Sequence, residues 1–178
     1  MGKQYPAISA DIQVFIERQH VFFVGTAAAD GRVNISPKGQ DTLRVLGPNR
    51  VAWLNLTGSG NETAAHLLEV NRITLMWCAF EGPPNILRLY GTARIYHPRD
   101  AEWADLLPLF PALPGARQIL VVDVDLVQTS CGMAVPLLDY RAERNQLNDN
   151  MDKRGPEQVA QYWHTRNTRS IDGKPTGI

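Results

Sequence analysis

The chain lacks the features that mark disulfide-stabilised, metal-stabilised or membrane-spanning proteins. Its 178 residues include only two cysteines, Cys78 and Cys131, too few for a disulfide framework and without the paired spacing of a zinc site. No run approaches the roughly 20 apolar residues that a membrane-spanning helix needs, and the N-terminal segment has no apolar signal core. These absences predict a cytoplasmic protein with no membrane partner and no metal site.

Excess charge of either sign is also missing. Lysine and arginine together number 18, and aspartate and glutamate together number 18. A nucleic-acid-binding domain usually carries a strongly basic surface, so this balance argues against nucleic acid as the main partner. A balanced net charge remains compatible with a local basic pocket. We therefore expect a small-molecule substrate, a second copy of the chain, or both as partners.

Short segments rich in β-branched and aromatic residues alternate with turn signals along most of the chain. They predict six or seven antiparallel strands, at 21–27, 33–36, 43–46, 51–56, 73–80, 86–96 and 119–127. Asp30-Gly31 is a strong hairpin signal, and Gly91 is the expected site of a bulge or bend. Strands at this close spacing favour a mainly β fold, a small antiparallel barrel with helical cover, over a parallel sheet.

The remaining apolar patterns predict peripheral helices. Those helices lie near 9–19, at 62–70, from Pro98 to Leu107, at 140–150 and at 157–164. The polar tail at 167–178 is expected to fray unless a ligand or a partner holds it.

One segment has the composition of an anion cradle. The apolar strand ending at Leu56 leads into Gly58-Ser59-Gly60-Asn61-Glu62-Thr63, which opens a helix. Unpaired N–H groups at a helix start favour phosphate, and Lys38 of the upstream Ser36-Pro37-Lys38-Gly39 turn could reach the same anion. The alternative is a capped helix with Ser59 or Asn61 as the N-cap. No Ser-His-Asp, Cys-His or paired-carboxylate arrangement stands out, so catalytic side chains stay unassigned.

Several motifs occur in the order found in one family. They are Phe23-Val24-Gly25-Thr26-Ala27, Asp30-Gly31-Arg32, Asn34-Ile35-Ser36-Pro37-Lys38-Gly39, the stretch from Gly58 to His66, Asn71-Arg72-Ile73-Thr74 and Ile86-Leu87-Arg88-Leu89-Tyr90-Gly91. From Ile12 to Leu138 the chain thus resembles the pyridoxamine 5′-phosphate oxidase-like flavoproteins, whose fold is the FMN-binding split barrel. The resemblance implies a flavin-binding split barrel at 1–138 and a helical extension with a tail, part of the same domain, at 139–178.

The resemblance also implies a homodimer with FMN at its interface. Ser36, Pro37, Lys38 and Gly39 would then line the flavin or its ribityl chain, with Lys38 also facing the phosphate. The phosphate would lie against Thr57, Ser59, Gly60, Asn61 and Thr63, with Arg88 as a second cation.

This sequence departs from the true oxidases at the start of the helix. They place an Arg-Lys pair there, where this chain has Asn61-Glu62-Thr63, and Glu62 would repel a phosphate if it faced inward. The implied function is an FMN-dependent oxidoreductase acting on an unknown small organic substrate. The alternatives are a non-catalytic module that binds or senses flavin, deazaflavin or haem, and a dimer without cofactor.

Overall fold

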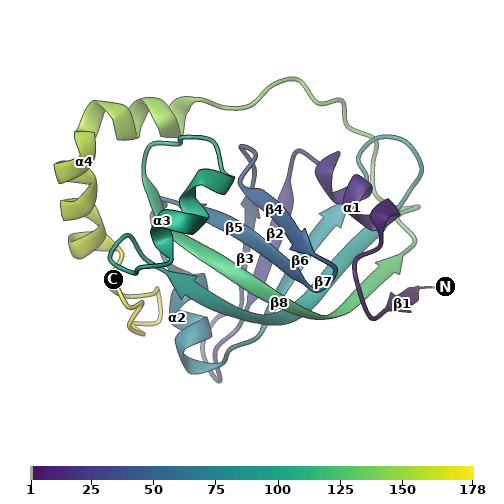
Figure 1. The fold of residues 1–178 in the computed structure, drawn as a ribbon, viewed down its shortest axis with the longest axis horizontal. Coiled ribbons are helices and arrows are strands. Elements are labelled where there is room, and N and C mark those ends of the chain that lie inside the picture. Colours follow the sequence, from purple (N-terminus) through teal and green to yellow (C-terminus); the bar gives the residue numbers. More distant parts are fainter. Residues whose placement is uncertain (1) are drawn as a thin grey trace.

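The computed structural model describes residues 2–178 and shows a mainly antiparallel β protein (Figure 1). Its strands are β1 (Lys3–Tyr5), β2 (Phe22–Thr26), β3 (Asn34–Lys38), β4 (Leu43–Gly47), β5 (Arg50–Leu56), β6 (Ile73–Cys78), β7 (Ile86–Tyr96) and β8 (Ala116–Ser130). They form one sheet in the order β3-β2-β6-β7-β8-β5-β4, and β1 pairs with β8. Within residues 2–178 the end strands β3 and β4 are not paired with each other, so the barrel is open.

Helices cover the periphery of the sheet. They are α1 (Ala10–Glu17), α2 (Glu62–Glu69), the short α3 (Trp103–Leu106) with a 3-10 turn at Leu107–Leu109, and α4 (Gln146–Arg166). Among the described residues, no helix combines the length and the apolar character needed to cross a membrane. The predicted fold class, a mainly β split barrel with helical cover, is confirmed.

The core has two parts because the sheet curves around one face and is covered by α3 on the other. Alternate residues of β2 and β6 point inward, so that Val24 and Leu75 are fully buried beside Trp53 and Trp77 in the larger cluster. The smaller cluster packs residues of β5 and β8 against Phe110 after the 3-10 turn. Period-2 alternation therefore fixes which strand faces remain free to line a pocket.

The predicted irregularity at Gly91 is confirmed. The register between β7 and β8 shifts between Tyr90 and Gly91. A Cβ placed on Gly91 would lie 2.0 Å from the carbonyl oxygen of Asp123. Only glycine allows the two backbones to approach this closely.

Several boundaries differ from the prediction. β1 was not expected, β8 extends beyond 119–127 at both ends, and α3 is shorter than the helix expected from Pro98 to Leu107. The prediction of a helix at 140–150 was wrong for its first half, because residues up to Asn145 are not helical. There the backbone N–H of Tyr140 instead binds the Glu81 carboxylate at 3.1 Å.

α4 contains the break that the sequence placed between two helices. Gly155 has φ 72° inside it, a left-handed conformation that suits glycine, and Pro156 follows. The chain therefore changes direction in mid-helix. This bend brings the second half of α4 back along the barrel, as Figure 1 shows.

The C-terminal tail does not fray, contrary to expectation, because contacts within the chain hold it. The Thr176 hydroxyl is buried and donates to the carbonyl oxygen of Asn167. Asp172 pairs with Arg32 of the β2–β3 hairpin, and Lys174 bridges Asp30 and Glu69. The bonds from Lys174 to these two carboxylates raise its pKa to about 12. The tail is thus fastened across the β2–β3 hairpin and α2.

Candidate functional site

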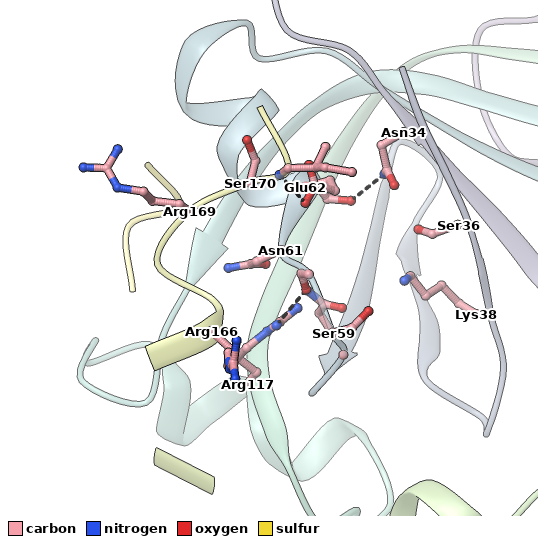
Figure 2. A pocket seen from close by; sticks show the side chains of 15 residues that line it. Asn34, Ser36, Lys38, Ser59, Asn61, Glu62, Arg117, Arg166, Arg169 and Ser170 are labelled. Carbon is pink, nitrogen blue, oxygen red and sulfur yellow. Dashed lines mark hydrogen bonds between the residues drawn. The ribbon is translucent and has the colours of Figure 1, made fainter. Parts of the chain in front are cut away.

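A polar pocket of about 600 Å³ lies where β3, the loop before α2, β8 and the tail meet (Figure 2). It is lined by Asn34, Ser36, Lys38, Asn55, Gly58, Ser59, Gly60, Asn61, Glu62, Thr63, Arg117, Arg166, Arg169, Ser170 and Ile171. The pocket therefore joins segments that lie up to 137 positions apart in the sequence, from Asn34 to Ile171.

One wall is a single face of β3. Asn34, Ser36 and Lys38 are half-buried toward the pocket, and the intervening Ile35 and Pro37 are exposed on the other face. The Asn34 amide donates to the Thr63 hydroxyl at 3.2 Å, which fastens β3 to the first turn of α2. Alternation along the strand thus presents two neutral polar groups and one amine to a ligand.

Lys38 is held in an environment that disfavours its charge. Its ammonium lies 5.1 Å from the centre of the Trp53 ring. Burial, assisted by repulsion from Arg117, lowers its pKa to about 8. Since an adjacent anion favours the charged form, a phosphate in this pocket would raise the pKa of Lys38 again.

The loop from Gly58 to Asn61 is fixed by bonds to its carbonyl oxygens. The Asn167 amide donates to the carbonyl of Gly58 at 3.2 Å, and the Arg117 guanidinium donates to that of Gly60 at 3.0 Å. Arg117 also donates to Oδ1 of Asn167 at 2.7 Å. β8 and the end of α4 thereby position the loop that leads into α2.

Asn61 is the N-cap residue of α2, but its side chain makes no capping hydrogen bond. The residue is 2% exposed, and neither its amide nitrogen nor its amide oxygen has a partner among the described residues. A buried amide usually finds a partner. The capped-helix alternative therefore leaves Asn61 unexplained, whereas a ligand in the pocket would satisfy it.

Arg117 is a second buried group with unused bonding capacity. It is 3% exposed, its Nε has no partner, and in the described chain it forms no ion pair with a carboxylate. Burial lowers its pKa to about 10. Because a buried cation without a counter-ion is costly, the arrangement favours an anionic ligand.

Glu62 does not oppose an anion as directly as its sequence position suggested. Both of its carboxylate oxygens lie 3.1 Å from the backbone nitrogen of Ile171, which donates to them. The tail thus engages the one carboxylate of the pocket lining. The same segment brings Arg166, Arg169 and Ser170 to the rim.

The structure brings most of the predicted binding residues together. Ser36, Lys38, Ser59, Gly60, Asn61 and Thr63 all line the pocket. Pro37 and Gly39 do not, and they line a separate cavity, which Lys38 also borders. The Thr57 hydroxyl lies behind the loop and donates to Gly115, and Arg88 donates to the Ser130 hydroxyl. These last four remain predicted contacts outside this pocket.

Six polar residues of the site were not anticipated. They are Asn34, Asn55, Arg117, Arg166, Arg169 and Ser170. Asn34 could have been found, because it lies two and four positions before Ser36 and Lys38 on an alternating strand. Nothing local in the sequence marks the three arginines. In residues 2–178 no cluster of three histidine, cysteine, aspartate or glutamate side chains could hold a metal ion.

Comparison with known proteins identifies relatives. The family description pyridoxamine 5′-phosphate oxidase matches residues 8–131. The pyridoxamine 5′-phosphate oxidase family protein ustO of Aspergillus flavus is 35% identical over 191 aligned positions, covering 96% of this chain and 76% of that protein.

Solved structures share the fold at low sequence identity. A single-residue variant of HupZ from Group A Streptococcus gives a TM-score of 0.58 at 19% identity, covering 69% of this chain and 99% of that one. An FAD-binding protein of Mycobacterium smegmatis gives a TM-score of 0.51 at 15% identity, covering 71% of this chain and 97% of that one. A putative pyridoxamine 5′-phosphate oxidase of Lactobacillus delbrueckii gives 0.52 at 20% identity, covering 69% and 94%. Sequence match and fold together show that the chain belongs to the pyridoxamine 5′-phosphate oxidase family.

Proposed function

We propose that the protein is an FMN-dependent oxidoreductase that acts on a small organic substrate. The observation that carries the proposal is the pair of buried, incompletely bonded groups, Asn61 and Arg117, on one polar pocket of about 600 Å³. Family membership supports a flavin as the ligand, and the neighbour from Mycobacterium smegmatis is named as an FAD-binding protein.

The pocket offers suitable donors for the phosphate of FMN. Lys38 supplies positive charge, and the hydroxyls of Ser59 and Thr63 supply neutral donors. The backbone N–H groups of the first turn of α2 have no partners within the helix and lie at its positive end. Charge-assisted bonds of this kind are stronger than neutral ones. The chain can thus bind the phosphate without the Arg-Lys pair that the true oxidases place here.

In this proposal the chain's own residues bind and orient the cofactor. FMN supplies the electron-transfer chemistry when bound. The bond from Asn34 to Thr63 holds the β3 wall against α2, and Trp53 packs beneath the Lys38 ammonium. No dedicated acid–base pair is required, in agreement with the unassigned catalytic side chains.

We also propose a homodimer with the cofactor site near its interface. Val33, the residue before β3, and Ile35, within β3, are 69% and 70% exposed. They border an apolar groove of about 470 Å³, lined also by Phe23, Met76 and Tyr90. A second copy covering this face would bury them beside the β3 strand that lines the pocket. A monomeric mass in light scattering at micromolar concentration would contradict the dimer.

The decisive experiment is an FMN titration of purified protein, read by flavin absorbance and fluorescence. We expect binding of one FMN per chain, weakened about tenfold or more in Lys38→Ala. Lys153→Ala, an exposed change on α4 outside the pocket, is the matched control. A colourless protein that does not bind added FMN would overturn the proposal of FMN as the cofactor. Binding without turnover of any reduced nicotinamide or organic donor would favour the non-catalytic module instead.

A further inference from the structure

A buried histidine lies directly behind the wall of the pocket. His66 is 1% exposed and does not line the pocket itself. It lies one turn beyond Thr63 in α2, and its Nδ1 is 3.1 Å from the Thr26 hydroxyl of β2. Its Nε2 is buried without a partner among residues 2–178. An apolar side chain would fill this place without leaving a polar atom unpaired, so packing alone does not account for the imidazole.

Thr26 connects this histidine to the pocket. It is 5% exposed, and the register of β2 and β3 places it directly opposite Asn34. The Asn34 amide nitrogen donates to the Thr26 hydroxyl at 3.3 Å and to the Thr63 hydroxyl at 3.2 Å. These two bonds use both N–H groups of the amide. Because Asn34 lines the pocket wall (Figure 2), its amide oxygen is the atom left for a ligand.

The single hydrogen of the Thr26 hydroxyl gives this chain of bonds a direction. Since Thr26 Oγ1 accepts from Asn34, its own hydrogen is available for donation to His66 Nδ1. Nδ1 then carries no proton, and the ring proton lies on Nε2. If His66 could not accept, the Thr26 hydroxyl would find its acceptor in the Asn34 oxygen. The amide would then turn its nitrogen toward the pocket and offer a donor instead of an acceptor.

We propose that His66 is a positioning residue, which acts through Thr26 to hold the Asn34 amide oxygen toward the pocket as an acceptor for a ligand hydroxyl. The inference rests on the proposed function, because FMN joins its phosphate to the flavin through a ribityl chain that carries hydroxyls. An ionised phosphate has no hydrogen to donate to the amide oxygen, so it is directed toward the donors of Lys38 and Ser59. The relay of His66, Thr26 and Asn34 therefore selects a polyol phosphate over a simple alkyl phosphate.

The test compares two flavins that differ only in the hydroxyls of the chain. FMN and a flavin with an unsubstituted 5-phosphopentyl chain at N10 are titrated into the wild type and into variants of the relay. Thr26→Val keeps the side-chain volume and removes the hydroxyl, and His66→Phe keeps a ring and removes the acceptor. The matched controls are Thr26→Ser, which keeps the hydroxyl, and His66→Asn, whose amide oxygen can take the place of Nδ1.

The wild type should bind FMN about tenfold or more tightly than the phosphopentyl flavin. Thr26→Val and His66→Phe should lower this preference about fivefold or more, as expected for the loss of one hydrogen bond, and should keep the affinity for the phosphopentyl flavin within about twofold. Both controls should retain the preference. If His66→Phe does not fold, Thr26→Val alone decides the result.

Three results would overturn the inference. The wild type could show no preference between the two flavins, or Thr26→Val could keep the preference of the wild type. Thr26→Val could also weaken both flavins equally, which is the result expected if the relay only stabilises the fold.

Failure of the proposed function would be recognised separately. If neither flavin binds, ribitol 5-phosphate and pentyl phosphate are added in turn and the melting temperature is measured. A larger rise with ribitol 5-phosphate in the wild type and in Thr26→Ser, but not in Thr26→Val, would retain the relay for another polyol phosphate. Equal shifts in the wild type, or none, would overturn the inference together with the proposed function.

Discussion

The indole N–H of Trp163 donates to the Thr57 hydroxyl over 2.8 Å, across 106 positions of sequence. Thr57 immediately precedes the loop from Gly58 to Asn61, and its hydroxyl also donates to the Gly115 carbonyl at 2.7 Å. The second half of α4 is therefore attached to the base of the pocket loop. A change in the second half of α4 should therefore alter the pocket even where the changed residue touches no ligand.

Trp163→Phe should lower the free energy of unfolding by about 1 kcal/mol, because it removes one partly buried hydrogen bond while keeping most of the ring. FMN affinity should fall severalfold as the loop loosens. Chemical denaturation and FMN titration measure the two effects. Trp103→Phe is the control, since Trp103, the first residue of α3, packs against the smaller core cluster and does not line the pocket. Equal losses of FMN affinity in both variants would show that Trp163 does not act through the loop.

The affinity for FMN should depend on pH through Lys38. The amine has a pKa of about 8 in the free protein, and a bound phosphate would raise it. Binding then takes up a proton above pH 8 but not below it. Affinity should be constant from pH 7 to 8 and should fall by up to about tenfold per pH unit above 8. Calorimetric titrations at pH 7 to 9.5 test this, and Lys38→Ala should show no such decline.

Gly91→Ala should destabilise the protein by about 3 kcal/mol or more. The added Cβ would lie 2.0 Å from the Asp123 carbonyl oxygen, so β7 and β8 must separate at the bulge. Urea denaturation gives the loss. Gly47→Ala, in β4, is the matched control because a Cβ there meets nothing within 4 Å. A stability close to that of the control would show that the bulge is not as tight as described.

Thr176→Val should lower the free energy of unfolding by about 1–2 kcal/mol. The valine keeps the buried volume but cannot donate to the Asn167 carbonyl. Amide exchange of the tail should rise more than exchange in β7, because the tail is released before the barrel opens. Uniform acceleration over the whole chain would instead make Thr176 part of the global unfolding unit.

The strands were predictable from the sequence because their signals are local. Alternating apolar residues define β2 and β6, and Gly91 marks the bulge in β7. β1 was missed because three residues show no periodicity, and its pairing with β8 depends on a strand more than 120 positions away. Residues 140–145 were misassigned because tertiary bonds, such as that from Tyr140 to Glu81, override their helical propensity.

The candidate site was predictable only on the side whose residues carry local sequence signals. Ser36, Lys38 and the loop before α2 carry local signals of anion binding. The arginines do not: Arg117 resembles any charge at a strand edge, and Arg166 and Arg169 reach the pocket only because α4 bends at Gly155 and the tail is fastened by Asp172 and Lys174. Long-range packing, invisible in composition, determines that side of the pocket.

Because the pocket includes residues of the tail, the tail also determines when the pocket can form. The barrel needs nothing beyond β8, which ends at Ser130, to complete its strand pairs. The pocket additionally needs residues 166–171. A chain emerging from the ribosome can therefore complete its barrel before its ligand site exists. A ligand can occupy the complete pocket only after residues 166–171 have packed against the barrel, whereas the strand pairs need nothing from that segment.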